Sequence, residues 1–415
     1  SGVMIKTGIY ALLRIISIIG PPPPWWGWVI VAAGASSGLI GVVFALAQHD
    51  LKRLLAYHSV ENIGIIAMGL GLGLLGWSYG DRLVMLAGFA GCLLHVINHA
   101  IFKGLLFMSA GSVLHATGCR DMEMMGGLLK KMPVTGWTFL TGSAAICGLP
   151  PLNGFVSEFM IYTAALLCVL NQHTGAVLPG IVVIGALAMI GGLAAACFTK
   201  AFGVVFLGEP RSAEMTKAHE CCWRMRLPMI CLAAACLAVA LAAPLTVPAL
   251  SAAAGNVVAG DSGMEGPGSA TLRAITLCLS AAAAGFLVLL LILARIRHCL
   301  LRRRAISIAP TWDCGFARPT ARMQYTAASF AQPVTNLFRN ALDIQTQGRA
   351  PKEFFPGKTS FSAHADDTAN RYFFAPIFRS VDRFLARLLW IQEGRVQVYV
   401  LYITVTLLAL LLVAL

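Results

Sequence analysis

The sequence predicts an all-α fold, a polytopic transmembrane helical bundle of about nine spans with one broken helix and a C-terminal amphipathic surface helix. Composition is the first indication, because 58% of the 415 residues are hydrophobic, only 12% are charged and mean hydropathy is +0.77. A soluble domain carries about 25% charged residues. Apolar runs of the length needed to cross a bilayer recur along the chain. Basic residues fall in every second loop between these runs, as expected for a multi-pass topology.

The candidate spans share a core of about 20 apolar residues. They cover 1–19, 28–48, 54–76, 82–116, 134–171 (interrupted), 178–207, 228–250, 271–297 and 395–415. The first span starts in apolar sequence at Ser1 and has no cleavage site of a signal peptide. We therefore expect a helix that is entered part-way, in a chain that lacks the N-terminus of a longer protein.

Loop charge predicts the orientation of the spans. Lys and Arg gather in 49–53, 118–132, 208–227 and the region after Arg295, whereas 21–26, 77–81, 171–175 and 251–270 contain neither residue. Positively charged loops stay on the cytoplasmic side of a membrane. The alternation predicts that the first set is cytoplasmic and that 134–171 crosses once.

The span 134–171 is interrupted by CGLPPLNGF at 147–155, which contains Pro150, Pro151 and Gly154. Proline removes backbone donors and breaks a helix. Lipid cannot satisfy the freed carbonyl groups, so such a break must face protein or a wet cavity. Broken helices of this kind accompany ion sites in transporters, although a packing kink is the simpler alternative.

Residues 298–394 have a different character from the spans. HCLLRRR at 298–304 is followed by polar sequence that includes TWDCGFARPTARMQYTAASF. Within 371–392, apolar residues recur at helical spacing with arginines between them, which predicts an amphipathic lateral helix on the membrane surface or on a partner subunit. The last span, 395–415, then anchors the tail.

Titratable side chains at membrane depth are the main functional signal, because charge there is costly. Lys6 lies in VMIKTGIY, and a buried lysine can accept and release a proton where arginine cannot. His95, His99 and Lys103 follow one another every four residues in HVINHAIFKGLLF, so they form a narrow stripe on one helix. Imidazole can donate from one nitrogen while accepting at the other. The stripe predicts a proton relay.

Further titratable residues accompany the stripe. Glu158 follows the proline break and is a candidate proton-loading site. His58 and Glu61 share a helix face at i, i+3 and could pair. Lys200 could serve the path or anchor the span at its interface. Lys52 lies in the loop HDLKR, where a solvated turn is the alternative.

Other classes of site are not supported by the sequence. Two histidines without a third ligand do not predict a metal site, and the twelve cysteines contain no CxxC pair for zinc or an iron–sulfur cluster. No phosphate-binding loop, dinucleotide fingerprint or nucleophile elbow is present, so we expect no catalytic residue. The net charge of +13 lies in loops and tail, which fits membrane topology rather than nucleic acid.

An ordered set of segments resembles a known family. VMIKTGIYALLR, HDLKRLLAYHSVENIG, HVINHAIFKGLLFMSAGSV, DMEMMGGLLKKMP and GLPPLNGFVSEFMIY are similar to the antiporter-like membrane subunits of respiratory complex I, cation/proton antiporters and membrane-bound hydrogenases. AYHSVENIG and the tail around TWDCG most resemble the hydrogenase-4 and formate hydrogenlyase branch.

The resemblance implies two inverted five-helix repeats, each with a broken helix, around a polar axis in the membrane. By this likeness, 1–19 is the last helix of a truncated first repeat, 28–207 is the second repeat, 228–297 holds two further helices, 298–394 is a cytoplasmic segment with the lateral helix and 395–415 is the anchor. Lys6 matches the central lysine of the family. The stripe matches the connecting path, and Glu158 matches the acidic residue at the second broken helix.

The expected function is therefore that of a non-catalytic, proton-translocating subunit in the bacterial inner membrane. It would couple electron transfer in peripheral hydrogenase subunits to proton movement through a hydrated relay. The chain itself would hold no cofactor, and nickel–iron and iron–sulfur centres would belong to partner subunits. A cation/proton antiporter subunit, a complex I-like quinone oxidoreductase subunit and a truncated, non-conducting scaffold are the alternatives.

Overall fold

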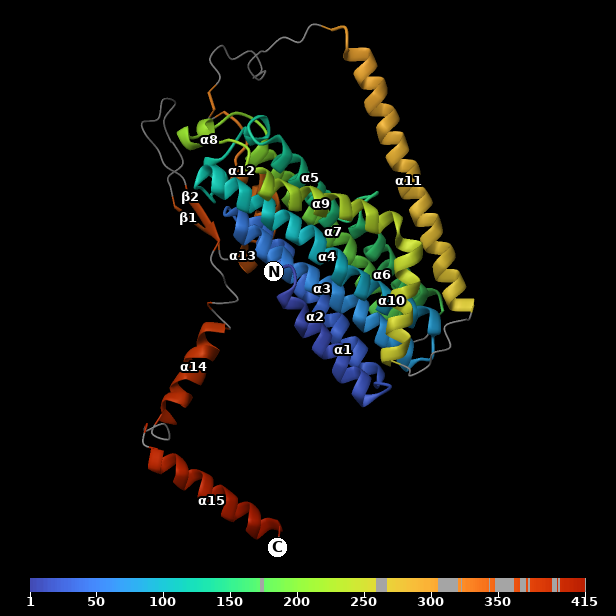
Figure 1. Ribbon diagram of the computed structural model, residues 1–415, viewed down its shortest axis with the longest axis vertical. Coiled ribbons are helices and arrows are strands. Elements are labelled where there is room, and N and C mark those ends of the chain that lie inside the picture. Colours follow the sequence, from blue (N-terminus) through green and yellow to red (C-terminus); the bar gives the residue numbers. More distant parts are fainter. Residues whose placement is uncertain are drawn as a thin grey trace. The chain divides into compact units, whose positions relative to one another are not determined.

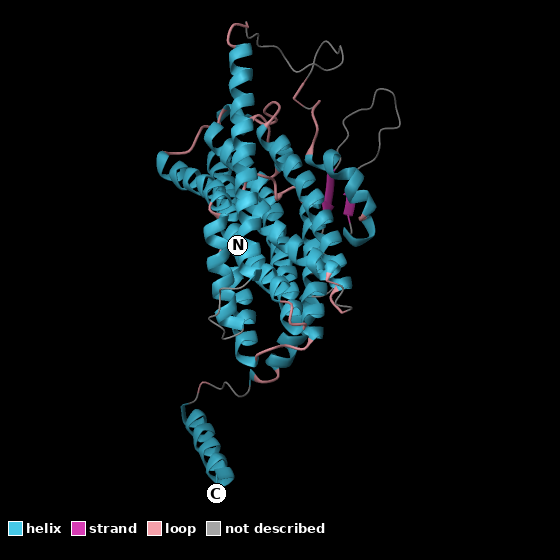
Figure 2. Cartoon of the chain, turned by 90° about the vertical axis from the view of Figure 1, so that its right-hand side faces the viewer, coloured by secondary structure: helices cyan, strands magenta, loops and turns pink. Residues whose placement is uncertain are grey.

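The computed structural model describes residues 1–171, 175–258, 267–304, 320–321, 323–342, 344–347, 362–365, 371, 374–389, 394 and 396–414. The chain forms two compact units, Ser1–Phe338 and Arg339–Leu415. Within these ranges nearly all regular structure is helical, and the two strands are short (Figures 1 and 2). Eight of the described helices are long and apolar enough to cross a membrane. The all-α multi-pass fold that the composition predicts is thus confirmed.

The first unit is a bundle of long helices with short connections (Figure 1). Its long helices are α1 (Thr7–Ile19), α2 (Pro24–Ala47), α3 (Leu51–Ser78), α4 (Arg82–Thr117), α5 (Pro133–Ile146), α6 (Asn153–Leu170), α7 (Val177–Phe206), α9 (Trp223–Leu241), α10 (Ala243–Val258) and α11 (Pro267–Leu301). Its short elements are η1 (Met4–Lys6), η2 (Met122–Met124), η3 (Leu128–Lys130), α8 (Ala213–Lys217) and α12 (Ala327–Leu337).

The second unit contains α13 (Arg339–Leu342), a two-stranded antiparallel sheet of β1 (Ile344–Gln347) and β2 (Ser362–Ala365), α14 (Ala375–Ala386) and α15 (Val396–Ala414). α14 is the predicted amphipathic helix, with Phe378, Phe384 and Leu385 exposed. It is shorter than the predicted range 371–392. The first part of the TWDCG segment, 311–319, lies outside the described residues.

Local sequence explains where the central helices begin and end. Asp50 caps α3 by accepting hydrogen bonds from the backbone N–H groups of Lys52 and Arg53 at 2.8 and 3.0 Å. Asp81 caps α4 in the same way through Val84. α4 ends at Gly118, whose φ of 66° is the left-handed conformation that glycine adopts without strain.

Glycines let α2 and α3 pack closely. A Cβ atom added to Gly34 would lie 2.7 Å from the carbonyl oxygen of Gly64, and one added to Gly64 would lie 2.5 Å from the backbone of Gly34. Small residues of this kind allow helix backbones to approach within a membrane bundle. The close contact fixes α3, which carries part of the site, against α2.

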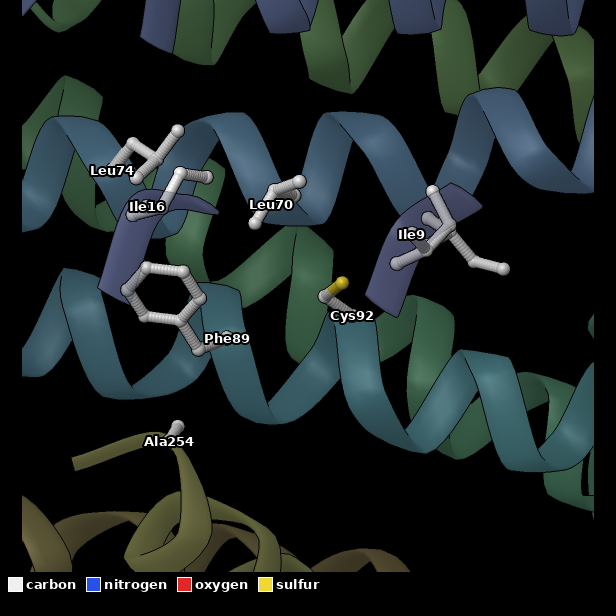
Figure 3. Packing of buried hydrophobic residues seen from close by; sticks show 8 residues of the cluster. Ile9, Ile16, Leu70, Leu74, Phe89, Cys92 and Ala254 are labelled. Atoms are coloured by element: carbon white, nitrogen blue, oxygen red, sulfur yellow. The ribbon is translucent and has the colours of Figure 1, made fainter. Parts of the chain in front are cut away.

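An apolar cluster covers α3 and α4 on another side. Ile9 and Ile16 of α1 pack with Leu70 of α3 and Phe89 of α4, and Ala254 of α10 joins the same cluster (Figure 3). Thus α1, which precedes α3 in the chain, and α10, which follows α9, both pack in the cluster that contains α4 residues. This helix is consequently central in the first unit.

The loops gather at two ends of the bundle. At the end that we call the basic end, the N–H of Leu51 donates to the carbonyl oxygen of Arg120 at 3.0 Å, and that of Gly127 donates to Leu207 at 2.9 Å. At the opposite end, Ser78 donates to the carbonyl oxygen of Pro22 at 2.8 Å and Asn171 donates to Asp81 at 2.7 Å. Thus α5 and α6 together make one crossing, as the loop charges predict.

Two predicted spans differ from the observed helices. Residues 228–250 are not one helix, because α9 ends at Leu241 and α10 starts at Ala243. The predicted first span contains η1 and the 13-residue α1, which is shorter than a spanning helix. Apolar composition continues across both interruptions, so hydropathy alone did not reveal them. The assignment of 28–207 as one repeat stays a prediction.

Candidate functional site

α4 carries the predicted stripe through the centre of the bundle. His95, His99 and Lys103 all lie in this helix and are fully buried. Because they are spaced by four residues, they share one helix face. The sequence pattern therefore places three titratable groups in the interior rather than on a lipid-facing surface.

Lys6 lies beside the stripe at the end of η1. Its side chain is 8% exposed, and its ammonium group donates to the carbonyl oxygen of Gly2. Gly2 packs directly on α4, because a Cβ atom added to it would lie 3.6 Å from the carbonyl oxygen of Ala100 and 3.9 Å from the backbone nitrogen of Gly104. The structure thus brings together four of the five predicted relay residues at one place.

α3 brings a carboxylate to the same region. His58 and Glu61 are fully buried, and the Nδ1 atom of His58 bonds the Glu61 carboxylate one helical turn away. α3 packs against both α4 and α6. Glu61 therefore lies on a helix that adjoins both the stripe and the broken helix, a position that its spacing in the sequence could not reveal.

Glu158 lies against the break between α5 and α6. Its carboxylate occupies the space where a Cβ atom on Gly148 would be, and Gly148 has a φ of 63°. Pro150 and Pro151 are joined by a cis peptide bond in this segment. At Gly154 the first turn of α6 approaches the carbonyl oxygen of Ala145 so closely that no larger residue fits. These features fold the predicted break around the acidic side chain.

Polar side chains that the sequence reasoning missed connect the stripe to the break. Asn98 of α4 donates to the carbonyl oxygen of Asn153 at 2.7 Å, and the Asn153 side chain donates back to Asn98 at 3.1 Å. Asn62 of α3 and Ser157 of α6 each lie at hydrogen-bond distance from His95. Asn98, Asn153, Asn62 and Ser157 are all buried. The only sequence signal was a polar residue in an otherwise apolar helix.

Several buried polar atoms in this region have no hydrogen-bond partner among the described residues. They are both ring nitrogens of His99, the Nζ atom of Lys103 and the Oε1 atom of Glu61. Buried polar groups in proteins are otherwise almost always paired, with water where no protein atom is available. These atoms are therefore suited to contacts with water or with mobile protons.

The remaining predicted residues lie elsewhere. Lys200 is fully buried, and its ammonium group donates to the carbonyl oxygens of Leu46 and Gln48 at 2.6 and 2.9 Å. Those carbonyls belong to the C-terminus of α2, where a cation is favourable. Lys52 is half-buried in the first turn of α3 at the basic end. Among the described residues, no group of three His, Cys, Asp or Glu side chains is placed to hold a metal ion.

Comparisons with known proteins bear on this arrangement. The family described as NADH:quinone oxidoreductase/Mrp antiporter, TM, matches residues 1–184. Hydrogenase-4 component B of Escherichia coli strain K12 is 33% identical, over 99% of this chain and 63% of that protein. Formate hydrogenlyase subunit 3 of the same strain is 37% identical, over 83% of this chain and 55% of that protein.

A solved archaeal respiratory complex, the membrane-bound sulfane sulfur reductase, has the same fold in one of its chains. The TM-score is 0.63 at 22% identity, over 99% of this chain and 62% of that chain. The chain spans 55% and 63% of the length of the two curated relatives named above. The chain is thus a multi-pass membrane protein whose residues 1–184 match the family of NADH:quinone oxidoreductase and Mrp antiporter membrane subunits.

Proposed function

We propose that this chain is a proton-translocating membrane subunit of a hydrogenase-4 or formate hydrogenlyase type complex in the bacterial inner membrane. The observation that carries the proposal is the line of titratable side chains from Lys6, along His99 and Lys103, through Glu61 to Glu158, of which all but the partly exposed Glu158 are buried. Buried ionisable groups are costly in a membrane bundle and are retained for function. The similarity to hydrogenase-4 component B over 99% of this chain and to formate hydrogenlyase subunit 3 over 83% supports the type of complex.

The relay would work through groups that exchange protons over short, hydrated steps. The unpartnered atoms of His99, Lys103 and Glu61 are the contact points for water. Since interior charges interact strongly, the charge at one of these groups changes the proton affinity of its neighbours. A charge movement imposed at one end of the line can therefore be passed to the other end.

His95 has an auxiliary place in this relay, because both ring nitrogens already contact protein atoms. His58 serves as the partner that holds the Glu61 carboxylate. Lys52 and Lys200 belong to the structural framework, since neither lies in the line. The break at Pro150, Pro151 and Gly154 gives Glu158 its position beside exposed backbone.

The partners in this proposal are other membrane subunits and peripheral hydrogenase subunits. Electron transfer would take place at their nickel–iron and iron–sulfur centres. The exposed apolar face of α14, with Phe378, Phe384 and Leu385, is suited to a neighbouring subunit or to the membrane surface. The match of residues 1–184 to a family model that includes Mrp antiporters supports a second candidate, a subunit of a cation/proton antiporter.

The test uses the full-length protein in its native complex, reconstituted in liposomes. A potassium diffusion potential, set with valinomycin, drives proton uptake, which an internal pH dye reports. We expect Lys6→Gln and Glu158→Gln to lower the rate at least about tenfold, equivalent to about 1.4 kcal/mol in the barrier. Co-purification of the partner subunits checks assembly in each case.

Glu209→Gln is the matched control, because Glu209 is exposed at the basic end and pairs with Lys130. It should leave proton uptake unchanged. Wild-type rates in an assembled Glu158→Gln complex would contradict the relay. A wild-type complex that assembles but takes up no protons would instead favour a non-conducting scaffold.

A further inference from the structure

We infer that Ser157 is a positioning residue that controls the protonation of His95, and thereby links the stripe to the broken helix. The inference rests on the proposed function, since it assigns a role within the same relay. It is carried by hydrogen-bond geometry around one buried imidazole.

Asn62 determines which nitrogen of His95 carries a fixed proton. The Asn62 amide nitrogen donates to the carbonyl oxygen of His58 at 2.8 Å, so the amide oxygen faces the other way. That oxygen lies 3.1 Å from Nε2 of His95. Because a carbonyl oxygen only accepts, Nε2 must be the donor. The proton that His95 gains or loses is therefore at Nδ1.

Nδ1 of His95 faces Ser157, whose hydroxyl oxygen is 2.9 Å away. The same oxygen accepts a hydrogen bond from the Asn98 amide at 3.0 Å. Its single proton has two kinds of acceptor within reach, which are Nδ1 and the carbonyl oxygen of Gly154 at 3.0 Å. A hydroxyl group rotates to suit its partners.

Rotation of this hydroxyl accommodates both charge states of the ring. With neutral His95, the Ser157 O–H donates to Nδ1. With charged His95, the Nδ1–H donates to the Ser157 oxygen, and the Ser157 O–H turns to Gly154. In both charge states the His95 ring stays in place, and every N–H and O–H group of this network has an acceptor. An alanine would leave Nδ1 without a partner, which is most costly for the charged form.

The link to the broken helix follows from where Ser157 lies. It is in the first turns of α6, next to Glu158, and the Asn98–Asn153 pair ties the same turns to α4. A change of charge on His95 therefore alters a hydrogen bond at the start of α6. The two partners of His95 are the Asn62 amide and the Ser157 hydroxyl, and neither of them titrates at physiological pH.

Titratable groups on α4 and on elements near it set the background for the titration of His95. They come from η1, from α4 itself, from α3, from α6 and from the first turn of α9. They are Lys6, His99, Lys103, His58, Glu61, Glu158, Arg224 and Arg226. α5 and α10, which also pack on α4, have no titratable side chain over Pro133–Ile146 and Ala243–Val258. A variant at Ser157 changes none of these charges.

The experiment measures the pH profile of potential-driven proton uptake in the reconstituted native complex. We expect Ser157→Ala to move the midpoint by about one pH unit toward acid, and Ser157→Thr to restore the wild-type profile because it keeps the hydroxyl. Ser143→Ala is the matched control. Ser143 is also buried, in the neighbouring helix, but its hydroxyl donates only to Phe139 of its own helix, at 2.8 Å.

A double-variant comparison separates positioning from general disturbance. In a His95→Gln background, Ser157→Ala should cause no further shift, because the titrating group is absent. An equal shift in both backgrounds, an unshifted profile in Ser157→Ala, or the same shift in Ser143→Ala would overturn the inference. If Ser157→Ala does not assemble, Ser157→Cys supports the same comparison with a weaker hydrogen bond. Absence of proton uptake in the wild type would instead refute the proposed function.

Discussion

Two fully buried lysines in this protein have opposite surroundings. Lys103 has no hydrogen-bond partner for its ammonium group among the described residues. The Nζ atom of Lys103 lies 5.8 Å from the centre of the Phe107 ring. Lys200 donates to two backbone carbonyls at the end of α2. Burial alone therefore does not distinguish a lysine available for proton exchange from one that holds a helix end.

Replacing each lysine by methionine should separate the two roles. Lys103→Met is expected to abolish potential-driven proton uptake while the complex still assembles, because the proton-binding group is lost. Lys200→Met is expected to lower thermal stability by about 1–3 kcal/mol, because two buried carbonyls lose a charged donor. Proton uptake per assembled complex and the thermal melting midpoint are the two readouts. Normal uptake in Lys103→Met would contradict the assignment.

At the residue scale, the sequence revealed those features that depend on one helix. The i, i+4 spacing of His95, His99 and Lys103 was sufficient to place them on one face. The positions of Asn62 and Ser157 could not be predicted, because they meet His95 from two other helices. Nor could the two buried lysines be distinguished, since the carbonyls that bind Lys200 lie about 150 residues earlier in the chain.

At the scale of elements, the break between α5 and α6 is built on glycines. Gly148 combines a φ of 63° with a Glu158 carboxylate in the place of a side chain. Gly148→Ala should therefore destabilise the protein by about 1–2 kcal/mol from backbone strain alone, with more from displacing Glu158. It should also slow proton uptake. Thermal melting and the liposome assay measure both effects.

Gly192→Ala in α7 is the control for this change. Nothing lies within 4 Å of a Cβ atom at Gly192, and its backbone is helical. This variant should melt at the same temperature or slightly higher, because alanine stabilises a helix interior by about 0.5–1 kcal/mol. Equal behaviour of the two variants would show that the conformation at Gly148 is not required.

α12 is held at the basic end by a carboxylate from the loop after α4. Glu123 accepts a hydrogen bond from the N–H of Ala328 at 2.7 Å and lies 3.3 Å from Nδ1 of His49. Burial by itself would raise the pKa of Glu123, but the hydrogen bonds from His49 and Ala328 lower it below its ordinary value. The ionised form is therefore the one that stabilises α12 in place.

This gives α12 a defined pH dependence. A carboxyl group whose pKa is lower in the folded state stabilises fully above its unfolded pKa, about 4.3, and loses that effect as pH falls through the folded value. We expect amide-exchange protection of 327–337 to fall over that acidic range. Glu123→Gln should lower the protection roughly fivefold at neutral pH and remove the pH dependence. A wild-type protection factor that is constant down to pH 3 would refute the assignment.

The elements themselves were predictable to different degrees. The span cores and the single crossing of α5 and α6 followed from hydropathy and loop charge. The end of α9 at Leu241 did not, because hydropathy stays apolar into α10; Pro244, which follows the end of α9, was the signal that hydropathy does not register. The start of α1 at Thr7 was also not predicted, since the apolar residues Val3, Met4 and Ile5 precede it, whereas its end at Ile19 coincides with the predicted end of the span.

At the scale of the whole first unit, the site lies where three structural features meet. α4 is enclosed by its neighbours, and α3 approaches α2 through glycines. The break between α5 and α6 lies against the Glu158 carboxylate. The basic loops 49–53, 118–132 and 208–227 lie at one end of the bundle, and the titratable line runs inside it. A bundle that only anchored partners would not need five or more ionisable groups in its interior.

The most direct test of the central claim is ion-specific flux through the wild-type native complex in liposomes under a potassium diffusion potential. The account predicts proton uptake well above that of protein-free liposomes, at the same rate in sodium-free and sodium-containing buffer, with no accompanying movement of radioactive sodium. Sodium movement coupled to proton movement would instead identify an antiporter subunit. Proton uptake no faster than in protein-free liposomes, with the complex assembled, would contradict the account.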